Sequence, residues 1–134
     1  MRRLLYKLFS NKATALLWSI IIFILLALPG NMLPNENHLA IPGLDKYVHI
    51  ILFGTFVFLW SLYFAIKDND KKFPLRKSLT ILVIACLYGT AMEYVQKYFI
   101  PNRDYDIYDI AADVVGAILG FLIVRLTFSW FRAS

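Results

Sequence analysis

Cysteine, acidic residues and nucleophile motifs are scarce in this chain of 134 residues. Its single cysteine, Cys86, excludes an intrachain disulfide and gives no information about the redox compartment. No serine, threonine or cysteine stands at a recognisable spacing from a base partner, so a triad-type hydrolase is disfavoured. The sequence also lacks an internal repeat or a broken helix, which argues against a transporter. Any chemistry must therefore come from acids, bases and amides.

Apolar residues are abundant and make up 60% of the chain. They predict helices over residues 13–29, 46–66, 78–97 and 106–126, each near the roughly 17–25 residues that cross about 30 Å of hydrocarbon. The stretches lack the alternating pattern of membrane barrel strands, which leaves helices as the way to pair backbone groups in lipid. We predict an all-α integral membrane bundle of four transmembrane helices in a single domain, residues 1–134.

The first apolar stretch has a competing interpretation as a secretory signal, because four bases precede it. It runs into Ala27-Leu28-Pro29-Gly30 without a clear small-x-small cleavage site. We therefore expect a retained anchor.

The fourteen basic residues predict the topology. Eleven of them precede the first helix, lie between the second and third, or lie at or beyond the end of the fourth, so the positive-inside rule places both termini in the cytoplasm. The net charge of +5 is thus a topology signal, and we expect no nucleic-acid partner because the aromatic residues form no exposed stacking platform. Seven of the nine acids fall on the outer side: Glu36, Asp45, Glu93, Asp104, Asp106, Asp109 and Asp113.

Helical spacing gathers the polar residues of the second helix on one face. Asp45 and His49 lie one turn apart, where the carboxylate could fix a tautomer of the imidazole or raise its pKa. The alternative is that Asp45 caps the helix N-terminus and His49 is a satisfied interfacial side chain. The same aspartate could serve both purposes.

The third and fourth helices repeat this arrangement. Ala85, Gly89, Glu93 and Gln96 share one face of the third helix. The fourth carries a stripe that is acidic in its outer half and small in its inner half: Asp106, Asp109, Asp113, Gly116 and Gly120. Because buried charges must be partnered, we expect an outward-facing pocket that holds His49, Glu93, Gln96, Arg103, Asp109 and Asp113 together.

Three functions fit such a pocket. It could be a structural network in which Arg103 and Gln96 satisfy the acids. It could bind a lipid or glycan headgroup through Arg103, Lys46 and Lys97. It could also be an enzyme site in which His49 or Glu93 moves a proton, Arg103 steadies an anion, and Asp109 and Asp113 hold a divalent cation.

The candidate roles follow from these alternatives. We take His49, Glu93 and Asp109 as candidate catalytic residues, without assigning a resident metal, and leave open whether the protein is an enzyme. The candidate ligand-binding residues are Asp45, Lys46, Gln96, Arg103 and Asp113. The sequence does not indicate an oligomeric state.

Taken in chain order, these motifs resemble the VanZ-like family over about residues 25–122. The resemblance rests on Asp45-Lys46-x-x-His49-x-x-x-Phe53, Gly89-x-x-x-Glu93-x-x-Gln96, Arg103, Asp109 and Gly116-x-x-x-Gly120. The chain departs from the family at Asp113, where asparagine is common.

The resemblance implies a multi-pass protein of the bacterial cytoplasmic (inner) membrane with four helices. The namesake of the family is linked to low-level resistance to the glycopeptide teicoplanin. This implies a role in the cell envelope, with membrane lipids or lipid-linked precursors as partners at the outer leaflet and a pocket on the extracytoplasmic side. It does not supply a reaction.

Overall fold

The computed structural model describes residues 8–32, 42–67 and 72–132. Within them the chain forms helices α2 (Lys12–Leu26), α4 (Leu44–Lys67), α5 (Leu75–Phe99) and α6 (Ile107–Arg132), with a short 3₁₀ helix, η1 (Gly30–Met32). No strand occurs among these residues, which confirms the all-α class. Most of the basic lead-in, most of the outer loop and part of the loop between α4 and α5 lie outside the described residues.

Local chemistry sets the helix ends. The Asn11 side chain accepts a hydrogen bond from Ala13 N–H at 3.0 Å and caps α2. α2 ends at Leu26, three residues earlier than predicted, because Pro29 cannot continue a helix. α5 begins directly after Pro74 and stops before Pro101, whereas α6 continues to Arg132, six residues beyond its predicted end.

Three of the four helices are long and apolar enough to cross a membrane: α4, α5 and the part of α6 up to Trp130. At about 1.5 Å per residue they extend roughly 36–39 Å, whereas the 15 residues of α2 extend only about 22 Å. Many of the large side chains that remain exposed are apolar, among them Leu17, Leu87 and Leu126. Such an exterior is typical of a surface that contacts lipid.

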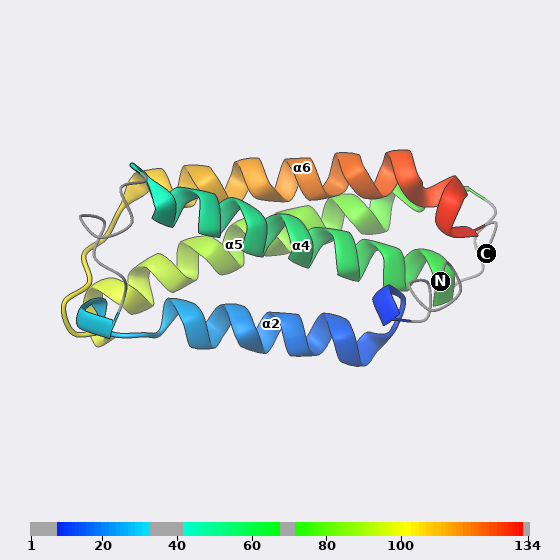
Figure 1. The fold of residues 1–134 in the computed structure, drawn as a ribbon. Coiled ribbons are helices and arrows are strands. Elements are labelled where there is room, and N and C mark those ends of the chain that lie inside the picture. Colours follow the sequence, from blue (N-terminus) through cyan, green and yellow to red (C-terminus); the bar gives the residue numbers. More distant parts are fainter. Residues whose placement is uncertain (1–7, 33–41, 68–71, 133–134) are drawn as a thin grey trace.

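The helices run alternately up and down (Figure 1). The most extensive packing joins α4 and α6, α5 packs against both, and α2 packs on α4 and α5. Hydrogen bonds of three aromatic side chains attach α2: Trp18 Nε1 donates to Leu52 O at 2.9 Å, Tyr88 OH to Ser19 O at 3.0 Å, and Trp60 Nε1 to Ser19 Oγ at 3.1 Å. Helix α2 therefore packs on the outside of a unit formed by α4, α5 and α6.

Glycine brings α4 and α6 into backbone contact. A Cβ at Gly120 would lie 2.1 Å from Gly54 O, and one at Gly116 would lie 2.4 Å from Ile50 O. No side chain fits at either position, so the Gly116-x-x-x-Gly120 motif is a helix-packing face. This close approach sets the register between the polar residues of α4 and those of α6.

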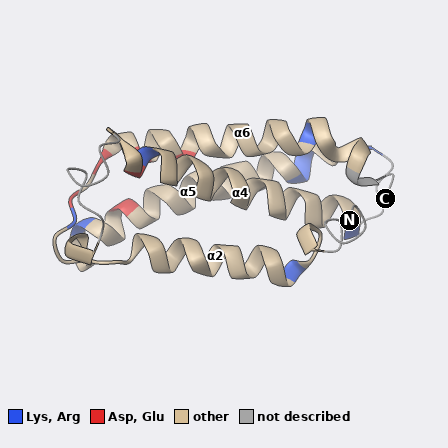
Figure 2. Cartoon of the chain, viewed as in Figure 1, with Lys and Arg blue, Asp and Glu red and all other residues tan. Residues whose placement is uncertain are grey.

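Charge is divided between the two ends of the bundle (Figure 2). All six acids in the described part of the chain lie toward the end where α4 and α6 begin and α5 ends: Asp45, Glu93, Asp104, Asp106, Asp109 and Asp113. Toward the opposite end lie bases such as Lys12 and Arg76, in the first turns of α2 and α5, and Arg125, in the second half of α6. The predicted separation of charge is present in three dimensions, although the membrane side that each end faces stays a prediction.

Candidate functional site

Lys46 lies at the centre of an ion-pair cluster at the acidic end. Its Nζ donates to Oδ2 of Asp45 at 2.5 Å, Oδ2 of Asp106 at 2.7 Å and Oδ1 of Asp109 at 2.8 Å. An ammonium group has three donors, and these bonds use all of them. Lys46 therefore joins the first turn of α4 to the start of α6, and its ammonium is already occupied.

Asp106 also begins α6. It directly precedes Ile107, and its Oδ1 accepts a hydrogen bond from Tyr108 N–H at 2.8 Å, which is the bond of an N-cap. The hydrogen bond from the Lys46 ammonium, supported by the one from Tyr108 N–H, lowers the pKa of Asp106 below its ordinary value. Our candidate roles omitted Asp106, although its place at the head of the acidic stripe could have indicated one.

His49 is buried between two aspartates of α6. Its Nδ1 lies 2.8 Å from Oδ1 of Asp113, and its Nε2 lies 3.8 Å from Oδ2 of Asp109. Only 3% of His49 and 1% of Asp113 remain exposed. The alternative in which Asp45 orients the imidazole is wrong: Asp45 binds Lys46, and a residue 64 positions away in sequence binds His49. Asp45 lies inside α4, in its first turn, where a negative charge is favourable, and no capping hydrogen bond of its side chain occurs among the described residues.

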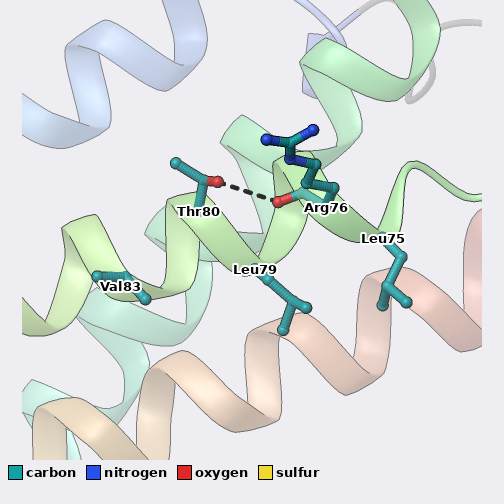
Figure 3. A pocket seen from close by; sticks show the side chains of 5 residues that line it. All are labelled: Leu75, Arg76, Leu79, Thr80 and Val83. Atoms are coloured by element: carbon teal, nitrogen blue, oxygen red, sulfur yellow. Dashed lines mark hydrogen bonds between the residues drawn. The ribbon is translucent and has the colours of Figure 1, made fainter.

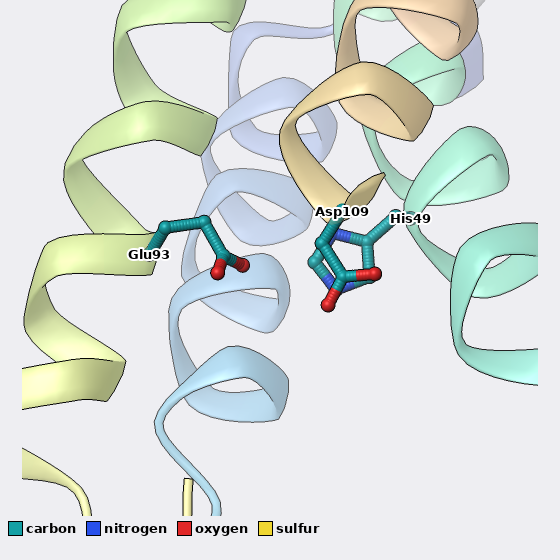
Figure 4. A group of neighbouring side chains, drawn as sticks. All are labelled: His49, Glu93 and Asp109. Carbon is teal, nitrogen blue, oxygen red and sulfur yellow. The ribbon is translucent and has the colours of Figure 1, made fainter. Parts of the chain in front are cut away.

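Glu93 projects from α5 toward His49 and Asp109 (Figure 4). Its Oε2 accepts a hydrogen bond from Asp106 N–H at 3.0 Å. Oε1 is buried and has no hydrogen-bond partner among the described residues, and only 1% of the residue is exposed. A carboxylate that leaves water normally finds partners for both oxygens, so Oε1 is available for a ligand or a proton.

Gly89 makes room for Asp113. A Cβ at Gly89 would lie 2.2 Å from Oδ2 of Asp113, so only glycine lets α5 pass this carboxylate. Asp113 Oδ2 is itself buried without a hydrogen-bond partner among the residues described. The shared face predicted for α5 is thus confirmed at Gly89 and Glu93.

Gln96 is directed toward α2. Its Nε2 donates to Leu26 O at 2.9 Å. Leu26 is the last residue of α2, where carbonyl groups lack partners within the helix. Gln96 therefore caps a carbonyl at the C-terminus of α2, and no hydrogen bond joins Gln96 to an acid in the described part of the chain.

Arg103 lies in the connection between α5 and α6, and this connection packs against the start of η1. Gly30 N–H donates to Pro101 O at 3.1 Å, and a Cβ at Gly30 would lie 1.8 Å from Asn102 O. Asn102 adopts the left-handed conformation, with φ of 57°. Arg103 forms no ion pair with the described acids, and its buried Nε has no partner among them. Lys46, and not Arg103, neutralises the acidic stripe.

Two groups of three side chains have ligand atoms close enough to share a cation. One is Asp45, Asp106 and Asp109, and the other is His49, Glu93 and Asp109. Asp113 is in neither group, and its Oδ1 faces His49, so the predicted cation pair of Asp109 and Asp113 stays a prediction.

The acidic end is the better candidate site than the apolar grooves on the helix surfaces. A groove of about 430 Å³ lies along the start of α5 and is lined by Leu75, Arg76, Leu79, Thr80 and Val83 (Figure 3). The hydroxyl of Thr80 donates to Arg76 O at 3.0 Å, so the groove presents no free nucleophile. Its apolar lining suits contact with lipid chains.

Comparison with known proteins agrees with the resemblance in the sequence. The profile of the VanZ/LLP1 family matches residues 5–129. An uncharacterized protein of the fission yeast Schizosaccharomyces pombe is 33% identical over 104 residues, which cover 76% of this chain and 59% of the relative. The chain therefore spans less than two thirds of that relative's length. No solved structure matches the chain. The helical architecture and the match over nearly its whole length show that the chain belongs to the VanZ/LLP1 family.

Proposed function

We propose that this protein is a multi-pass protein of the bacterial cytoplasmic membrane that binds the polar headgroup of a lipid or lipid-linked envelope precursor. Its acidic end faces the extracytoplasmic side. Membership of the VanZ/LLP1 family supports a role in the cell envelope, since the namesake of the family is linked to teicoplanin resistance. The observation that carries the proposal is the buried group formed by His49, Glu93, Asp109 and Asp113 inside an apolar bundle.

Packing alone does not account for this group. A charged side chain at the bilayer centre costs about 2.5–3.5 kcal/mol even on the mildest scale, and polar groups in membrane helices are usually functional. Here Oε1 of Glu93 and Oδ2 of Asp113 lack partners among the described residues, so the network is incomplete without a further molecule, ion or proton. A purely structural network would satisfy its own atoms.

Arg103 supports a headgroup as the missing partner. It lies three residues before Asp106 and forms no ion pair with the acids described. A guanidinium fork matches the oxygens of phosphate and carboxylate groups. With Lys46 occupied by aspartates, Arg103 and Lys97 are the cationic groups at this end that suit an anionic headgroup.

The test is the thermal stability of the detergent-purified full chain with added lipids. Undecaprenyl phosphate and phosphatidylglycerol should raise the melting temperature more than phosphatidylcholine does. Arg103→Gln should remove the increase, whereas Arg125→Gln, a matched change at the opposite end, should keep it. The proposal fails if these anionic lipids give no increase, or if Arg103→Gln responds as the wild type does.

A second candidate function, acid–base catalysis on the same headgroup, is favoured by the setting of His49. Asp113 holds one ring nitrogen, and the other lies 3.8 Å from Oδ2 of Asp109, beyond hydrogen-bond distance, so it is available to exchange a proton with a substrate. Incubation with a lipid-linked precursor, followed by mass spectrometry, should then show a product that His49→Gln fails to form. Headgroup binding without any product would contradict the catalytic function and keep the binding function.

A further inference from the structure

We propose that His49, Glu93 and Asp109 bind a divalent transition-metal ion, for which Zn²⁺ is the best probe. One ligand atom from each of these buried residues lies within 4.8 Å of the others. The residues come from α4, α5 and α6, so such an ion would join all three long helices (Figure 4). Small side-chain movements would bring the atoms to the ligand separations that bonds of about 2.0–2.2 Å require.

Each proposed ligand is already held by a second contact. Asp113 lies against Nδ1 of His49, Lys46 donates to Oδ1 of Asp109, and Asp106 N–H donates to Oε2 of Glu93. When Nδ1 carries the proton, Nε2 presents its lone pair, and a carboxylate behind the imidazole is the usual second contact of a metal-binding histidine. Asp113 thus acts as a positioning residue.

The independent observation is Oε1 of Glu93. It is buried with no partner among the described residues, and the carboxylate is directed toward His49 and Asp109. A metal ion would supply its missing contact.

The excess of negative charge at this end also favours a bound cation. Five carboxylates gather here (Asp45, Glu93, Asp106, Asp109 and Asp113) against the single ammonium of Lys46, which leaves four negative charges when all are ionised and His49 is neutral. Asp45 and Asp106 are partly exposed, but Glu93, Asp109 and Asp113 are buried. Excess negative charge is unfavourable at these buried positions, and a divalent cation would halve the total.

Lys46 decides between the two possible cation groups. Its Nζ already bonds to Asp45, Asp106 and Asp109, and therefore fills the first group with a positive charge. In the second group the ammonium reaches only Oδ1 of Asp109, while Oδ2 of Asp109 faces His49. It also includes an imidazole, which suits zinc, whereas a group with only oxygen ligands suits magnesium or calcium.

The metal site rests on the proposed function and explains how an acidic centre accepts an anionic headgroup. Three protein ligands leave coordination positions open, as in catalytic rather than structural sites. An oxygen of the headgroup can fill an open position, with Arg103 as a second positive partner.

The test is equilibrium dialysis of metal-stripped full-length protein against Zn²⁺ in detergent, without lipid, followed by elemental analysis. We expect about one ion per chain. Glu93→Gln should bind Zn²⁺ at least about 100-fold more weakly, because it keeps an oxygen for Asp106 N–H but loses the charged ligand. Asp104→Asn removes an exposed loop acid outside both cation groups and should bind as the wild type does.

X-ray absorption of the Zn²⁺-loaded wild type checks the site without any variant. We expect one imidazole nitrogen among oxygen ligands, and a shell without histidine would overturn the assignment. Stoichiometry near zero, or wild-type affinity in Glu93→Gln, would overturn it as well. If stripped protein binds anionic lipid but never Zn²⁺, the metal site fails while the proposed function stands; Zn²⁺ binding without any lipid binding gives the reverse result.

Discussion

Single side chains at the acidic end carry several contacts each. Lys46 was expected to bind a ligand, but its three donors are used by aspartates from two helices. Asp106 both caps α6 and accepts from Lys46, and Asp113 orients the buried imidazole of His49. Substitutions at these positions should therefore separate the effects of charge from those of shape.

Asp113 gives the first such separation. Asp113→Asn keeps an oxygen that accepts from Nδ1 of His49, so the unfolding free energy should stay within about 1 kcal/mol of the wild type. Asp113→Leu leaves the buried Nδ1–H unpaired and should cost about 1–3 kcal/mol. Denaturant unfolding in detergent measures both. Equal stability of the two variants would show that the contact with His49 does not hold the helices.

The dependence of stability on pH should come partly from Asp106. Lys46 lowers its pKa in the folded protein, so the stabilisation is fully present above the ordinary carboxyl pKa of about 3.9. It is lost as the pH falls through the lower pKa of the folded state. The melting temperature should therefore decrease below about pH 4, and the difference between the wild type and Asp106→Asn should shrink there.

The control for this titration is Asp104→Asn. This variant removes a neighbouring exposed acid and should keep the wild-type pH profile. A constant difference between Asp106→Asn and the wild type across this range would contradict the role of Asp106.

At the scale of helices, glycine determines how the polar faces meet. Gly116 and Gly120 leave no room for a side chain between α4 and α6, and Gly89 leaves none beside Asp113. Gly54 is also tight, because a Cβ there would lie 3.0 Å from Gly116 O. Since Gly116 contacts the backbone of Ile50, next to His49, this crossing also fixes the distance from His49 to Asp113.

The helices themselves were predictable from the sequence, whereas their register was not. Apolar length and prolines indicate the four helices, and helical spacing correctly places Glu93, Asp109 and Asp113 on buried faces. The partner of His49 depends on how α4 is rotated and shifted against α6, and that depends on backbone contacts distant in sequence. For the same reason the sequence did not show that Gln96 binds Leu26 O, or that Lys46 takes the place expected for Arg103.

An added methyl group should disrupt the crossing. Gly120→Ala places a Cβ against Gly54 O, so α4 and α6 must separate, at a cost of about 1–3 kcal/mol. Ile118→Ala, at a partly exposed position on the same helix, should cost less. Thermal unfolding in detergent distinguishes the two, and a Gly120→Ala protein that melts like the wild type would contradict the close approach.

At the scale of the whole molecule, charge polarity predicts the orientation in the membrane. The basic end should face the cytoplasm, because positive loops are retained there. In a chain whose single cysteine, Cys86, has been replaced by serine, Asn37→Cys should react with an impermeant thiol reagent on intact cells. Asn69→Cys should react only after the membrane is opened. Both positions lie outside the described residues, and the reverse labelling would contradict the orientation.

The central claim is that the buried group at the acidic end is a working site, and Glu93→Gln tests it most directly. The amide keeps the size of the side chain and an acceptor for Asp106 N–H, but it carries no negative charge. The measurement is the increase in melting temperature that undecaprenyl phosphate produces, taken beside the melting temperature without lipid. We predict that Glu93→Gln melts close to the wild type without lipid and loses the increase. A variant that melts normally and responds fully to the lipid would show that Glu93 serves only the packing of the bundle.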